Sequence, residues 1–249
     1  MSFIPLNAED FVVSSDSITS TLWSNKTTTL TNVYISGSGD EILNSIYLPV
    51  YAENPITNNS ALPQFSIAYG QFQGSGSAPI NASIPGLSPT RVTYGQFRTL
   101  INGDENTNLN FGVGNTDSPD FYVINISRAN YKEKLFPGTF NLILSGSSIG
   151  PLKLTDNSID STTLSYCDAG RVFDIISGSN GSATTATPFG GAVSGYTVSG
   201  SYGKFLPDVG LIILNPQALK LTVAQGGIGL IPGVSNTNTT LNSTNVALK

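Results

Sequence analysis

The stretch from Asp120 to Gly146, DFYVINISRANYKEKLFPGTFNLILSG, constrains the fold more than any other part of the chain. It begins and ends with apolar, strand-forming runs, at residues 121–126 and 140–144. The chain's main group of opposite charges lies between these two runs. The stretch therefore predicts two strands and a charged connection, which is an architectural unit without a catalytic motif.

The connection itself has features of a short helix. Ser127 is a candidate N-cap, and Tyr131 and Leu135 are four residues apart, which would stack them on one helical face. Pro137-Gly138 would end the helix in a turn. We therefore expect one or two helical turns between the two strands.

A longer helix is predicted upstream, with its start at Ser88-Pro89-Thr90. Serine is a favourable cap, and proline is favourable at the first helical position. Tyr94, Phe97 and Leu100-Ile101 follow at helical spacing, and Gly103 would end the helix. This segment predicts a helix that buries an aromatic face.

Most of the remaining sequence alternates short strand-forming runs with turn residues. Charged residues are only 11% of the chain, and Gly, Ser, Thr and Asn fill the positions that Lys and Glu usually take. One further helical turn, Asn215 to Leu219, is predicted with Asn215 as its cap. Strands are expected at residues 27–36, 42–51, 64–70, 109–113, 151–154, 164–166, 171–176, 195–201, 206–214 and 219–224. The sequence thus predicts an all-β protein: a β-sandwich core with two or three short helices and extended terminal arms.

Periodicity also suggests how the chain is divided. We expect an N-terminal arm at residues 1–15, a β-rich globular domain at 16–225, as one unit or two subdomains, and a flexible Asn/Thr-rich arm at 226–249. The first residues show no secretory signal pattern, and the longest apolar run, Val209 to Leu214, has the length of a strand. We therefore expect no membrane association.

The charge pattern disfavours nucleic acid as a partner. The net charge is −5, with an isoelectric point near 4.5. The densest basic group, Arg128, Lys132 and Lys134, is diluted by Glu133. Phosphate binding needs clustered Lys and Arg, so we expect no contact with DNA or RNA.

Catalytic chemistry has few residues to use. The chain has no histidine, which excludes Ser-His-Asp, Cys-His and His-based metal sites, and its single cysteine, Cys167, cannot form an intrachain disulfide. The remaining candidates are pairs of acids in polar turns: Asp104 with Glu105, Asp117 with Asp120, and Asp156 with Asp160. The turn at 155–161, with Asn157 between its two acids, lacks the order of a calcium-binding loop. We expect a protein that is not an enzyme, with no catalytic, cofactor-binding or metal-binding residues.

Several segments, in order along the chain, carry a resemblance to a known family. They are SSDSITSTLWSNKTTTLTNVYIS, FSIAYGQFQGSGS, TRVTYGQFRTLI, YVINISRANYKEKLFPGTFNLILSG, LTDNSIDS, AGRVFDIISGS and SYGKFLPDVGLIILNPQAL. Together they cover most of the chain from Ser15 to Leu219, and the combination is more specific than any one piece. The chain resembles a module of virion structural proteins of T4-like myoviruses, particularly those of cyanophages.

The resemblance implies a non-enzymatic component of the phage particle, of the tail or baseplate rather than the head shell. It implies assembly in the host cytoplasm, other virion proteins as partners, and a homo-oligomer or ring, since tail parts repeat around an axis. We expect the two arms to add strands to neighbouring subunits.

Two alternatives remain open. The first is a module that binds host-surface glycan, with Trp23, Tyr196 and Tyr202 as aromatic platforms beside the polar loop at 177–191. The second is a capsid decoration protein, for which the same composition would serve.

Overall fold

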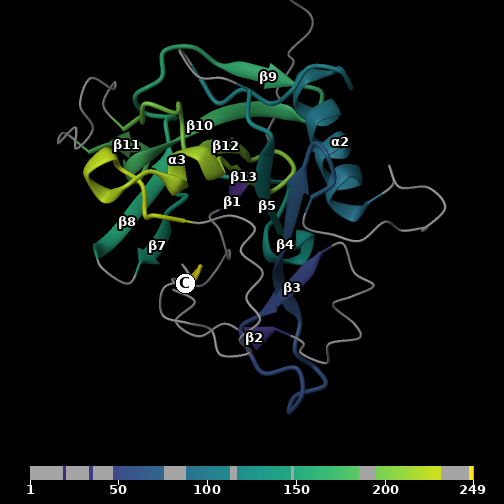
Figure 1. Cartoon of the computed structure of the whole chain (residues 1–249). Coiled ribbons are helices and arrows are strands. Elements are labelled where there is room, and N and C mark those ends of the chain that lie inside the picture. Colours follow the sequence, from purple (N-terminus) through teal and green to yellow (C-terminus); the bar gives the residue numbers. More distant parts are fainter. Residues whose placement is uncertain are drawn as a thin grey trace, which may run out of the picture.

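The structure is a computed structural model that describes residues 19–20, 34–35, 47–75, 88–112, 117–146, 149–184, 195–230 and 247–248. The prediction of an all-β protein with few short helices is confirmed: a curled antiparallel sheet dominates the described residues, which hold two α-helices (Figure 1). These helices are α2 (Pro89–Asn102) and α3 (Pro216–Lys220).

The main sheet has 12 strands within the described residues. Its path runs β14-β7-β8-β10-β12-β13-β5-β4-β3-β2, and β9 and β11 also pair with β10, all antiparallel. The strands are β2 (Tyr34–Ile35), β3 (Leu48–Tyr51), β4 (Pro63–Gln71), β5 (Asp120–Ile126), β7 (Leu142–Gly146), β8 (Ile149–Asp156), β9 (Ser165–Cys167), β10 (Gly170–Ser179), β11 (Ser182–Ala183), β12 (Gly203–Leu206), β13 (Leu211–Leu214) and β14 (Ala247–Leu248). Separately, β1 (Thr19–Ser20) pairs in parallel with β6 (Lys134–Leu135).

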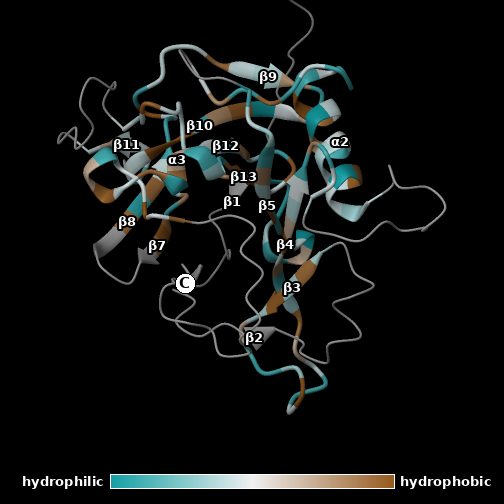
Figure 2. Ribbon diagram, viewed as in Figure 1, coloured by the Kyte–Doolittle hydropathy of each residue, from teal (hydrophilic) through white to brown (hydrophobic). Residues whose placement is uncertain are grey.

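The central strands are buried on both faces. In β13 all four residues are buried, and successive side chains enter different core clusters: Leu211 and Ile213 one, Ile212 and Leu214 the other. Figure 2 shows hydrophobic colouring on several strands of the sheet, among them β3, β8 and β10. A continuous apolar run is expected where both faces of a strand are covered.

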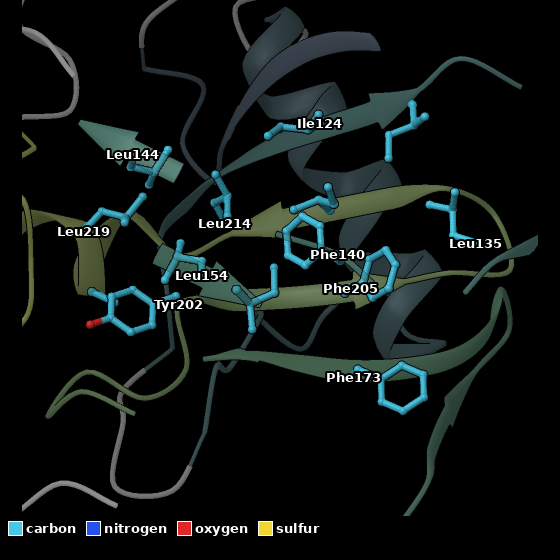
Figure 3. Close-up of a cluster of buried hydrophobic side chains, with 14 of the residues drawn as sticks. Ile124, Leu135, Phe140, Leu144, Leu154, Phe173, Tyr202, Phe205, Leu214 and Leu219 are labelled. Atoms are coloured by element: carbon cyan, nitrogen blue, oxygen red, sulfur yellow. The ribbon is translucent and has the colours of Figure 1, made fainter. Parts of the chain in front are cut away.

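The first cluster, here the α2-side core, includes Ala68, Tyr94, Phe97, Leu109, Phe111, Phe121, Val123, Val172, Leu206, Leu211 and Ile213. The second, the α3-side core, includes Ile124, Ile126, Tyr131, Leu135, Phe140, Leu144, Leu154, Phe173, Ile175, Tyr202, Phe205, Ile212, Leu214, Ala218, Leu219 and Ile228 (Figure 3).

Helix α2 closes the first of these cores as predicted. Ser88 is its N-cap residue, Pro89 lies in its first turn, and Gly103 ends it with a left-handed φ of 67°. Tyr94 stacks on Phe121 with ring centroids 5.0 Å apart, and Phe97 meets the same ring edge-on at 6.1 Å. The predicted aromatic face therefore packs directly on β5.

The stretch at 120–146 contains the two predicted strands, β5 and β7, and one helical turn that begins after Ser127, as predicted; the predicted helical stacking of Tyr131 and Leu135 is wrong. The only helix in it is a single 3-10 turn, η2, at Arg128–Asn130. Leu135 lies instead in β6, and its N–H donates to the Pro207 carbonyl. Tyr131 is drawn into the α3-side core, so tertiary contacts with the β12–β13 connection override the local helical spacing.

Four other predicted strands need correction. Residues 206–214 form a hairpin of β12 and β13, because Pro207, Asp208 and Gly210 (φ 69°) supply turn chemistry between them. Of the predicted strands at 109–113 and 195–201, the described residues 109–112 and 195–201 contribute only isolated bridges. Residues 219–224 contain the end of α3 and the start of a 3-10 helix, η3 (Val223–Gln225).

The predicted arms lie only partly within the described residues. Residues 1–15 fall outside them. The start of the predicted C-terminal arm, residues 226–230, packs on the body: the Ile228 and Leu230 N–H groups both donate to the Leu219 carbonyl. Ile228 is buried in the α3-side core, so the packed body extends at least to residue 230.

Candidate functional site

The three acid pairs singled out in the sequence have structural uses. Asp104 is partly exposed and accepts hydrogen bonds from Thr107 and Asn106, which lower the pKa of its carboxyl. A general acid needs a raised pKa, so this turn is unsuited to that role. Glu105 beside it is exposed.

Asp117 is exposed, whereas Asp120 is only 6% exposed. Its two oxygens accept hydrogen bonds from Tyr69 Oη at 3.1 Å and from Gln217 Nε2 at 3.0 Å. Burial, reinforced by the Asp120 charge, raises the pKa of Tyr69. Asp120 thus joins β4, β5 and α3 as a structural acceptor.

Asp156 and Asp160 fix loops to one another. Buried Asp156 accepts from the Gly138 N–H at 2.9 and 3.0 Å and from the Ser158 N–H at 3.1 Å. Asp160 accepts from the Ala183 N–H at 2.6 Å. No group of three His, Cys, Asp or Glu side chains within the described part of the chain could hold a metal ion.

These bonds belong to a larger network, here called the loop cluster: residues 136–141, 156–161 and 179–183. Asn141 Nδ2 donates to Asn180 Oδ1 at 2.8 Å, and the Asn180 N–H returns a bond to Asn141 Oδ1 at 2.9 Å. The Ile159 N–H also donates to the Gly181 carbonyl. Because three connections are tied together by side chains and backbone, their surface is preorganised.

The surface carries exposed apolar side chains that the sequence analysis did not select. Phe136 and Ile159, both in the loop cluster, are 50% and 65% exposed. Leu164 and Tyr166, beside and within β9, are 58% and 68% exposed. The pattern that could have marked them in the sequence is the change from the exposed strand β9 to the largely buried strand β10. Exposed apolar side chains on rigid backbone are suited to contacts with other proteins.

Of the proposed sugar platforms, Tyr202 is ruled out. It is 0% exposed, and its hydroxyl donates to the Gly226 carbonyl at 2.7 Å. Tyr196 is half-buried and donates to Asp174; burial and the Asp174 charge raise its pKa to about 12. Trp23 lies outside the described residues. Residues 185–191 of the loop at 177–191 also lie outside them, whereas residues 177–184 are described and include the end of β10 and β11.

The predicted basic group is used locally. Arg128 donates to the Tyr131 carbonyl at 2.6 Å, and its guanidinium lies 4.7 Å from the centre of the Tyr131 ring. Lys134 Nζ lies 3.8 Å from Asp208 Oδ1, beside the Arg171–Asp208 ion pair at 2.8 Å. Arg128 and Lys134 therefore interact with other residues of the fold.

Cys167 is half-buried against the α2-side core, and burial raises the pKa of its thiol. A raised pKa disfavours the reactive thiolate.

Neither described helix has the length and apolar content that crossing a membrane would require.

The last feature is strand pairing by two short segments that lie near the two ends of the given sequence. Thr19 and Ser20 pair with Lys134 and Leu135, and Ala247 and Leu248 pair with Ser145 and Leu144. Both short pairings are held by the main chain.

No family model matches the chain, and no curated protein or solved structure is significantly similar to it.

Proposed function

We propose that the chain is a non-enzymatic structural subunit of a T4-like bacteriophage particle, in the tail or baseplate, which acts through protein–protein contacts. The observation that carries this proposal is strand addition: segments near both ends of the sequence attach to strand edges through main-chain pairing. Subunits that assemble in this way bind through backbone hydrogen bonds, with few demands on side-chain chemistry. The resemblance of the ordered sequence segments to virion proteins of cyanophages supports the same function.

The described surface is consistent with an assembly role. The body is stiffened by hydrogen bonds from side chains to backbone, as in the loop cluster, and its described residues form three ion pairs. Phe136, Ile159 and Tyr166 are large apolar side chains held at this surface. Such anchors contribute most when a partner covers them and excludes water.

The proposed partners are other virion proteins and further copies of this chain around the tail axis. The particle is the proposed location, after assembly in the host cytoplasm. Nucleic acid and membrane have no part in this function. The glycan-binding alternative gains no specific observation, since Tyr202 is buried and Tyr196 is hydrogen-bonded within the fold.

The test is to locate the protein in particles purified from a host infected by the phage that encodes it. Mass spectrometry should find the chain in stoichiometric amounts, and cryo-electron microscopy should place its β-rich body in the tail or baseplate. Density at a fibre tip with free loops would favour host recognition. Density on the capsid shell would refute the tail placement, and absence from the particle would refute the structural role.

A further inference from the structure

Strand β7 forms a poorly protected edge of the main sheet. Its sequence, LILSG, contains no charged residue and no proline, the usual devices that stop an edge strand from pairing with other chains. Near the other end of the sheet, β3, which pairs with the end strand β2, contains Pro49. One edge of β7 is taken by β8, and on the other, within the described residues, β14 pairs with Leu144 and Ser145 alone. This edge is therefore suited to accepting a strand.

The edge is also preformed. Leu144 is buried in the α3-side core, and Leu142 packs partly against it. Just before the strand, Asn141 exchanges two hydrogen bonds with Asn180 in the loop cluster. Ile143 remains 38% exposed. A strand held in this way loses little conformational freedom when a partner pairs with it.

The strand now paired with this edge reaches it over a long connection. Sixteen residues, 231–246, separate Leu230 in the packed body from Ala247 in β14. A connection of that length spans at most about 53–58 Å when extended. It is therefore long enough to reach β7 of the same copy or of a neighbour.

We propose that the β7 edge is the acceptor for β14 of a second copy, so that neighbouring subunits exchange their C-terminal strands. The antiparallel pairs Ala247–Ser145 and Leu248–Leu144 would be the same in the exchanged form, so exchange loses no main-chain bond. Adjacent copies in an assembly raise the local concentration of β14, which lets exchange compete with pairing inside one chain. This inference rests on the proposed structural function and names one of its contacts.

Cysteine trapping tests the exchange. All variants carry Cys167→Ser, so the only thiols are those introduced. One protein carries Ser145→Cys and the other, of different mass, carries Ala247→Cys; opposite residues in antiparallel strands have α-carbons about 4.5–5.5 Å apart, within the range of about 4.4–6.8 Å that a disulfide spans. Because each copy has one thiol, a bond between the two sites forms only between copies.

The control partner carries Val198→Cys, at a side chain that is 55% exposed and outside the sheet edge. In a glutathione buffer at high protein concentration, the Ser145→Cys and Ala247→Cys proteins should cross-link at least about tenfold faster than the control pair, as read by intact mass. Circular dichroism checks that each variant is folded. Equal rates for the two pairs would overturn strand exchange.

The two proposals fail separately. Equal rates, together with detection of the chain in purified particles, would leave the structural function standing without this contact. Fast trapping with absence from particles would keep the exchange and refute the virion role.

Discussion

The two faces of the central strands are closed in different ways. The α2-side core is closed largely by residues 89–111, which precede β5 directly in the sequence. The α3-side core is closed by β6, α3 and residues 226–230, which come from distant parts of the chain. One face therefore follows from local sequence, and the other is made only when the whole chain folds.

The largest predicted effect separates these faces by removing one buried ring from each. Phe121, between Tyr94 and Phe97, and Phe205, stacked on Phe140 at 5.1 Å, are both 0% exposed. Phe121→Ala and Phe205→Ala should each lower the free energy of unfolding by about 3–5 kcal/mol, because each leaves a cavity. Chemical denaturation measures the loss.

Hydrogen exchange then shows which face has loosened. Phe121→Ala should speed exchange in α2, and Phe205→Ala should speed it at the Leu135 amide, which donates to Pro207. Ile159→Ala, at an exposed side chain, is the control and should change stability little. If both core variants expose the same amides, the faces do not open separately.

A smaller effect comes from one hydroxyl on each face. Tyr202 Oη donates to the Gly226 carbonyl at 2.7 Å, and Tyr94 Oη donates to the Ser118 carbonyl at 2.6 Å and accepts from the Leu109 N–H at 3.3 Å. Replacement by Phe leaves buried backbone groups without a partner, at a cost of about 1–3 kcal/mol.

Limited proteolysis distinguishes these two variants. Tyr202→Phe should increase cleavage near residues 226–230, while Tyr94→Phe should leave that region protected and destabilise the segment at 109–118. Tyr94→Phe should be the more destabilising, since it removes two bonds. Unchanged cleavage in Tyr202→Phe would show that this hydroxyl does not hold residues 226–230 to the body.

The same division explains what could be predicted from sequence. Helix α2 was predictable because its cap, proline, aromatic spacing and terminal glycine lie within one short segment. The position of Leu135 was not, since it lies in β6 and bonds to Pro207, more than seventy residues away, instead of stacking on Tyr131. The β12–β13 hairpin was missed although Pro207, Asp208 and Gly210 carried a turn pattern.

The site predictions divide in a similar way. Asp104, Glu105 and Asp160 lie in or beside polar turns as predicted, but Asp120 and Asp156 are buried in β5 and β8. The sequence could not show that Asp156 binds Gly138 or that Asp120 binds Gln217, because these pairs are brought together by the sheet. Tyr202 was predicted as an exposed aromatic platform, but it is fully buried. Its burial depends on α3 and residues 226–230.

The smallest predicted effect lies at the rim of the α3-side core and depends on pH. Burial alone would raise the pKa of Asp208, but hydrogen bonds from Arg171 and the charges of Arg171 and Lys134 lower it overall. A lowered pKa in the folded state contributes stability above the unfolded value of about 3.9, and this is lost as pH falls through the folded value.

Asp208→Asn should cost about 1 kcal/mol or less at pH 7. The difference in stability between the variant and wild type should disappear toward pH 2, because protonation of Asp208 removes the same contribution from wild type. Denaturation at both pH values measures this, with Glu105→Gln as the control for removing one exposed charge. An equal deficit at both pH values would mean that Asp208 acts through shape alone. The ion pair would then contribute nothing to stability at the rim of the α3-side core. The two faces would differ only in the order in which their elements occur in the chain.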